Sequence, residues 1–427
     1  MKGARYWLFN WLDANHITDT ETAKRALSER SVLEDLKEVA NQETPTLEPI
    51  QKDEPAILAG RILDLSGNLD CDTPSCRELR VNTLFRKAWH YFDRIIVADV
   101  VRHEMTHHWE FTIEHPTDRL LAHLAGVIYL RKIGAEDLVD FREKPPCWKD
   151  WASKAQKLGF QNIVDAAQVL KATLERESRF FTGKSDGNFL IYKIEHTEPD
   201  INMIGQLPLK EIGKLSKKQL KQRAIQKSVD GFARHLLSDV ITAKLLGVPL
   251  GSIVGVHGKL LSDGANGPSP ADVAFKLDLP VLNGVPIDIL TRVRRDEKDS
   301  FQRFRDSLRT AIKERLNNST SNRSDQIAEQ IRLDIIEPEL RRIRDRLHAA
   351  EMTLTKKSAL GIFMGALVTT CGILSGIPGP TSIAAGIGTM VTTETSAANK
   401  YLEEKQDISL SCMYFLWKTV EHSHHNL

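Results

Sequence analysis

The sequence RIIVADVVRHEMTHHW occupies residues 94–109 and carries the clearest structural signal in the chain. Its first six residues form a short apolar run, which predicts either a buried strand or the start of a helix. The remaining ten predict a helix. In that helix His103 and His107 are four positions apart, so their imidazole rings lie one turn apart on the same face. Two imidazoles in this arrangement can hold one zinc ion.

Residues 100–109 resemble the HExxH signature of the zincin metallopeptidases. Positions 105 and 106 are uncharged and positions 100, 101 and 109 are apolar, as the extended signature prefers. The resemblance covers these ten residues only. It implies zinc as the cofactor, with His103 and His107 as its ligands. It also implies that Glu104 acts as general base and acid on zinc-bound water, and that a peptide or protein is the substrate.

A catalytic zinc of this type needs a third protein ligand and an open position for water. The metzincin continuation requires Gly and His where Glu110 and Ile113 stand, which disfavours that branch. The gluzincin pattern supplies a Glu from a later helix, with an Asp four residues further on that supports the first histidine. Glu136 and Asp140 have this form. We therefore expect Glu136 as the third ligand and Asp140 as its neighbour in the outer layer of the site.

Rival interpretations of the motif stay open. The separation between His107 and Glu136 is longer than the commonest gluzincin spacing, and Gly134 does not suggest a helix already under way. His115, His123 and Glu114 are alternative third ligands. A further alternative is an amphipathic helix whose histidines are surface or core residues and bind no metal.

Composition sets the broad class of the protein. A chain of 427 residues with 41% hydrophobic and 27% charged residues is typical of a globular protein with two or three domains. A net charge of +1 gives neither a global basic field for nucleic acid nor an acidic excess for disorder. Five cysteines are an odd number and form no disulfide framework in a chain of this size. Because the N-terminus lacks the features of a secretory signal, we expect a cytoplasmic protein.

Hydrophobic periodicity predicts an α+β, predominantly helical fold. Further strand candidates are residues 57–63, 138–141 and 188–194, while residues 118–133 have the apolar spacing of a helix. The domains predicted from these patterns are a helical segment at 1–50, a mixed α/β domain carrying HExxH at 51–205, a basic helix with a Gly/Pro-rich connector at 206–290, and a helical bundle at 291–427.

Residues 205–230 are strongly basic. Seven lysines and arginines stand against a single acid, Glu211, before Asp230. Such a helix can rest on a phosphate backbone or another anionic surface. No aromatic residue is interleaved with the lysines to stack on bases, so we interpret the segment as a solvated helix face and do not expect a nucleic acid partner.

The segment 358–393 contains no charged residue. It predicts an apolar C-terminal helical hairpin, turned at Pro378-Gly379-Pro380. The hairpin either packs against the preceding bundle or makes conditional contact with a membrane, as a peripheral membrane protein does. This gives a second hypothesis for the chain: a non-enzymatic helical effector or interaction protein of bacterial type, in place of a zinc-dependent hydrolase.

Overall fold

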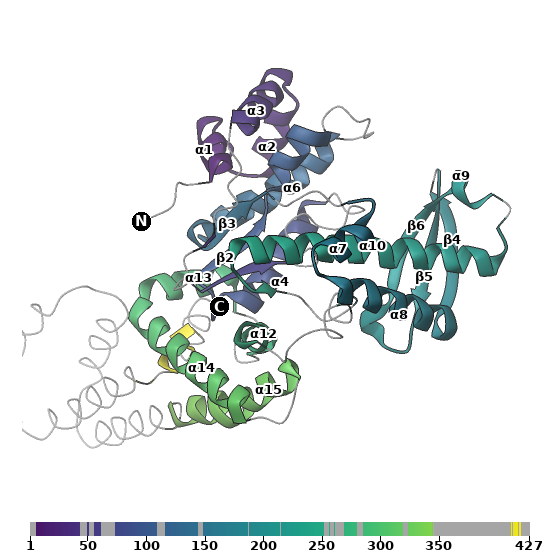
Figure 1. The fold of residues 1–427 in the computed structure, drawn as a ribbon. Helices are drawn as coiled ribbons and strands as arrows, with labels where there is room; N and C mark the ends of the chain where they lie inside the picture. The colour runs from purple at the N-terminus through teal and green to yellow at the C-terminus, as the bar shows by residue number, and fades with distance from the viewer. Residues whose placement is uncertain are drawn as a thin grey trace, which may run out of the picture. The chain divides into compact units, whose positions relative to one another are not determined.

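The protein is represented by a computed structural model of the 427-residue chain. The residues that the structure describes are 6–42, 49–50, 55–60, 73–108, 116–143, 148–186, 188–213, 215–251, 256, 260, 269–279, 285–318, 323–343, 345, 411, 413–416 and 418–419. They form a predominantly helical α+β fold, as the sequence predicts (Figure 1). The chain divides into two compact units, residues 1–278 with 315–328, and residues 279–314 with 329–427.

A parallel sheet lies at the centre of the first unit. It contains β1 (Ala56–Ala59), β2 (Arg94–Ala98), β3 (Val139–Arg142) and β7 (Leu250–Gly251), in the order β3-β2-β1-β7. Helices connect successive strands, because parallel neighbours need a crossover: α4 (Pro74–Ala88) leads from β1 to β2. All four residues of β1 are buried, which is typical of a parallel sheet covered on both faces.

The carboxyl ends of these strands form one edge of the sheet, here called the carboxyl edge. The chain leaves β1 toward β2 and β3 on one side and returns to β7 on the other, so the strand order reverses between β1 and β7. A Cβ atom on Gly60, at the end of β1, would lie 2.9 Å from the carbonyl oxygen of Gly251, so only glycine fits this close approach. Open parallel sheets of this kind bind ligands at the carboxyl edge.

The residues around HExxH differ from the expected uniform α-helix. Residues 94–98 are the strand β2, which settles the alternative left open by the sequence. After Asp99 the chain forms a single α-helical turn, α5 (Val100–His103), and then a π-helix, η1 (Glu104–His108). The helix α6 (Pro116–Lys132) then leads back to the start of β3.

Three N-terminal helices pack directly onto this segment. They are α1 (Trp7–Ala14), α2 (Thr20–Leu27) and α3 (Arg30–Gln42). Their buried apolar residues share one core with Val101 and Met105 of the HExxH segment and with α6. The guanidinium of Arg102 also donates to the carbonyl oxygen of Ala40 at 3.0 Å and pairs with Glu143 at 3.1 Å. The N-terminal helices therefore hold the HExxH segment in place.

A second, antiparallel sheet follows in the first unit. Its strands are β4 (Arg179–Asp186), β5 (Phe189–Glu195) and β6 (Met203–Pro208), in the order β4-β5-β6. One face packs on α7 (Trp151–Lys157), α8 (Gln161–Glu177) and the N-terminal half of α10 (Lys217–Leu246) (Figure 1). The short η3 (Pro199–Ile201) and α9 (Leu209–Ile212) flank β6. The helix α12 (Pro270–Lys276) begins at a capping box on Ser269.

The second unit is helical in the residues described. Its helices are α13 (Ile287–Asp296), α14 (Lys298–Asn318), which continues past the unit boundary, and the π-helix η5 (Arg332–Ile336). Between α14 and η5, the helix α15 (Ser324–Ile331) also crosses the boundary between the two units. Phe301 and Phe304 of α14 pack on Phe415, with ring centroids 5.0 and 6.0 Å apart. Among the described residues no helix is both long and apolar enough to cross a membrane. The predicted hairpin at 358–393 lies outside the described residues.

Candidate ligand site at the carboxyl edge

The HExxH segment begins directly at the carboxyl edge. Asp99 follows β2, and its Oδ1 atom accepts the backbone N–H of Arg102 at 3.0 Å, which caps α5. In the π-helix that follows, hydrogen bonds join residues five apart, so residues four apart no longer lie directly above one another. The spacing argument for a zinc pair therefore holds less well here than in an α-helix. The side chain of His107 lies outside the described residues.

Glu104, the expected general base, lies in an ion pair. Its Oε1 atom accepts a hydrogen bond at 2.6 Å from Nη2 of Arg119, which comes from the first turn of α6. The Glu104 side chain is only 13% exposed. A partly buried carboxylate beside a guanidinium is held in place by both charge and hydrogen bonding. The pair joins the HExxH segment to α6.

His123 lies one helical turn beyond Arg119 on α6 and is 4% exposed. Within the part of the chain that the structure describes, neither of its ring nitrogens has a hydrogen-bond partner. Burial lowers the pKa of His123 well below its ordinary value, because the charged ring would lose its hydration, and the positive charges of Arg77 and Arg119 lower it further. The imidazole is therefore neutral at pH 7.

Arg77 brings α4 into the same group of residues. It lies in the first turn of α4 and is buried. A Cβ atom on Gly126 of α6 would lie 3.4 Å from Cβ of Arg77, so the two helices approach closely here. We call Glu104, Arg119, His123 and Arg77 the Arg119 cluster. With two guanidinium groups, one carboxylate and a neutral imidazole, its net charge is +1.

The structure does not bring Glu136 and Asp140 to the HExxH histidines. Glu136 lies in a 3-10 turn, η2 (Glu136–Leu138), which precedes β3 at the amino edge of the sheet, whereas His103 follows the carboxyl end of β2. Asp140 accepts hydrogen bonds from Arg142 at 3.0 and 2.9 Å and from Arg94 at 3.4 Å. Among the described residues, no three His, Cys, Asp or Glu side chains are close enough together to hold a metal ion. The rivals Glu114 and His115 lie outside those residues.

Asp99 is a buried carboxylate that the sequence did not single out. It accepts hydrogen bonds from Tyr6 Oη at 2.6 Å and from Trp7 Nε1 at 2.9 Å. Burial raises its pKa, although the hydrogen bonds from Tyr6 and Trp7 oppose the rise. The ring of Tyr6 also stacks on Phe141 of β3, with centroids 3.9 Å apart. The start of α1 thus covers the carboxyl edge at β2 and β3. A polar residue directly after a buried strand was the available sequence signal.

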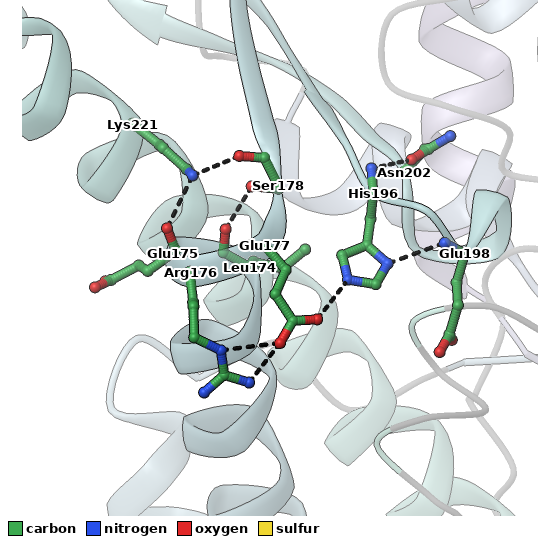
Figure 2. Close-up of polar contacts among 9 residues, drawn as sticks. All are labelled: Leu174, Glu175, Arg176, Glu177, Ser178, His196, Glu198, Asn202 and Lys221. Carbon is green, nitrogen blue, oxygen red and sulfur yellow. Dashed lines mark hydrogen bonds and ion pairs between the residues drawn. The ribbon is translucent and has the colours of Figure 1, made fainter.

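Another histidine, His196, lies in a polar network where β5 ends, away from the parallel sheet (Figure 2). Its Nδ1 atom accepts the backbone N–H of Glu198 at 3.0 Å, so Nε2 carries the hydrogen and faces Glu177 at 3.4 Å. The hydrogen bond from Arg176, and then that from His196, lowers the pKa of Glu177. Because both nitrogens of His196 have partners, this network joins the end of α8 to the second sheet and offers no free base.

No protein-family model, curated protein or solved structure matches this chain.

Proposed function

We propose that the carboxyl edge of the parallel sheet binds an anionic ligand at the Arg119 cluster, with a phosphate group as the best fit. The observation that supports this most is His123, whose two buried nitrogens have no hydrogen-bond partner among the described residues. Buried polar groups in proteins are nearly always hydrogen-bonded, and an exception calls for an explanation. A ligand oxygen would accept the ring N–H of the neutral imidazole.

The charge of the cluster favours an anion. Arg77 and Arg119 bring two positive charges into a buried region, and Glu104 balances one of them. The positive charges of both guanidinium groups act on His123, so a negatively charged ligand oxygen beside that ring would be attracted to them. Guanidinium groups bind the oxygens of phosphate and carboxylate through paired hydrogen bonds.

Ligand binding would also change the state of Glu104. An anion that takes hydrogen bonds from the guanidinium of Arg119 competes with the Oε1 atom of Glu104 for the same donor. Glu104 would then be released next to the bound ligand, where a carboxylate can act as a general base. Binding and the availability of the base are coupled through Arg119.

Calorimetric titration with inorganic phosphate tests the proposal. We expect saturable binding by the wild-type protein with a Kd of about 1 mM or lower. The variant His123→Leu should weaken binding about tenfold or more, since it removes the N–H donor. The control Arg131→Gln changes an arginine of the same helix that pairs with Asp13, and it should bind phosphate as wild type does. Equal affinity in the wild-type and His123→Leu proteins would refute the role of the cluster.

A zinc-dependent hydrolase is the second candidate, because His103 and Glu104 follow β2 at the edge where parallel sheets hold their sites. In that hypothesis His103 and His107 bind zinc and Glu104 activates water. Elemental analysis of protein purified without chelators should find about one zinc per chain, and none in the double variant His103→Ala/His107→Ala. Metal-free wild-type protein whose melting temperature does not change on adding zinc would eliminate this candidate.

A further inference from the structure

One face of the antiparallel sheet carries exposed apolar side chains. On the inner face, Tyr192 and Ile194 of β5 are buried against α8 and α10. Alternate residues of the strands point the other way. There, the register places Phe181 of β4, Lys193 of β5 and Ile204 of β6 in one row across the sheet.

The side chains in this row and next to it are among the most exposed large apolar residues described. Ile204 is 74% exposed, Phe181 46% and Phe189 40%. Phe189 lies on the same side of β5 as Lys193, four residues away, and Ile191 lies between them. Exposed apolar groups gathered on one surface indicate a binding site more than scattered ones do. Two exposed phenyl rings on a sheet are well suited to stacking.

Basic side chains lie on this face and at its edges, together with the acid Glu195. Arg179 lies on it directly opposite Glu195, and Lys193 lies at its centre and pairs with Glu195. At the β6 edge, Lys227 of α10 donates to the carbonyl oxygen of Gln206 at 2.9 Å. Near the start of β4, Lys221 donates to the carbonyl oxygen of Ser178 at 2.6 Å.

We propose that this face, the β4-β5-β6 face, binds single-stranded nucleic acid. Unpaired bases stack on exposed aromatic rings of a sheet, while nearby lysines and arginines receive the phosphates. Phe181 and Phe189 supply the rings, and Ile204 and Ile191 extend the apolar surface on which a base or sugar can rest. A duplex keeps its bases stacked on each other, so it could not use the rings.

In the sequence, no aromatic residue lies between the lysines of residues 205–230, and this predicted that nucleic acid is not a partner. Strand pairing supplies them from another part of the chain. Phe181 precedes the basic run by more than twenty residues, yet β4 lies in the same sheet as β6, which α10 contacts through Lys227. The aromatic and basic groups are far apart in the sequence, but they belong to the same sheet and to the helix that packs on it.

Fluorescence anisotropy with labelled 20-nucleotide single strands of DNA and RNA tests this proposal on the full chain. We expect binding at 50 mM salt that weakens as salt rises, and a duplex of the same length should bind less tightly. The variant Phe181→Ala/Phe189→Ala should weaken single-strand binding about tenfold or more, since stacking on each ring is lost. Val169→Ala is the control, because Val169 is an apolar residue on α8 that is 60% exposed, more than either phenylalanine.

Three results would overturn the proposal. The first is that the wild-type protein does not bind single strands, and the second is that the double variant binds them as tightly as wild type. The third is that Val169→Ala weakens binding as much as the double variant does. Sedimentation of the same proteins distinguishes a protein interface. A wild-type dimer that the double variant breaks, without any effect of oligonucleotide, would assign the face to self-association. Circular dichroism of each variant checks that the sheet is intact.

Discussion

Replacing His123 by leucine should make the protein more stable and less sensitive to acid. In the folded chain the imidazole is buried and neutral, and no described residue forms a hydrogen bond with either nitrogen. A buried polar atom left without a partner costs about 1–3 kcal/mol. Leucine has a similar volume and no polar atom, so we expect a gain of about 2 kcal/mol at pH 7.5.

The pH dependence follows from the lowered pKa of His123. Below the unfolded-state pKa, near 6.5, the unfolded chain binds a proton that the folded chain does not. The stability of the wild-type protein is therefore complete above that pH and falls as the pH decreases. Well below pH 6.5 the loss approaches about 1.4 kcal/mol per pH unit. Between pH 7.5 and 5.5, an interval that spans the unfolded-state pKa, the loss is about 1 kcal/mol. The leucine variant lacks this contribution.

Urea denaturation at pH 7.5 and 5.5 measures both effects. The quantity to compare is the loss of unfolding free energy between the two pH values, wild type against variant, since the other histidines titrate in both proteins. His196→Leu is the contrasting variant: both nitrogens of His196 have partners, so it should lose stability. If His123→Leu is destabilised at pH 7.5, or loses as much stability at pH 5.5 as wild type does, the assigned burial and ionisation of His123 are wrong.

Four further substitutions test contacts elsewhere in the first unit. Asp99→Ala should cost about 3 kcal/mol of unfolding free energy, because it leaves two buried donors and a helix cap without an acceptor. Asp35→Ala removes the acceptor of a single tryptophan N–H, so it should cost about 1 kcal/mol in the same denaturation assay. Gly205→Ala should cost about 2 kcal/mol, since its Cβ atom would lie 2.5 Å from Oη of the buried Tyr192; an unchanged melting temperature would contradict this. Ser216→Ala removes the capping box of α10 and should cost about 1 kcal/mol, visible as a lower melting temperature.

Periodicity predicted local structure well in this chain. The strands β2, β3 and β5 and the helix α6 lie where the apolar patterns place them, within a few residues at each end. The pattern gave no pairing partners, however. The parallel order β3-β2-β1-β7 depends on Gly60 and Gly251 approaching each other, and these residues are far apart in the sequence. Local patterns carry no information on such contacts.

The site was harder to predict because it depends on tertiary contacts. The motif directed attention to His103 and Glu104, which do lie at the carboxyl edge. The ion pair of Glu104 with Arg119 joins residues on two different helices, and no spacing rule anticipates it. Glu136 matched a spacing pattern, but the register of β2 with β3 places it at the opposite edge of the sheet.

The pairing of β7 with β1 has a consequence for how the chain is made. Leu58 of β1 pairs with Leu250 of β7, and the whole antiparallel sheet is synthesised between them. At typical translation rates of about 5–20 residues per second, roughly 10–40 seconds pass between the two strands leaving the ribosome. During that interval one side of β1 has no strand beside it. The nascent chain thus presents an apolar strand edge, the kind of surface that chaperones bind and that other chains can pair with.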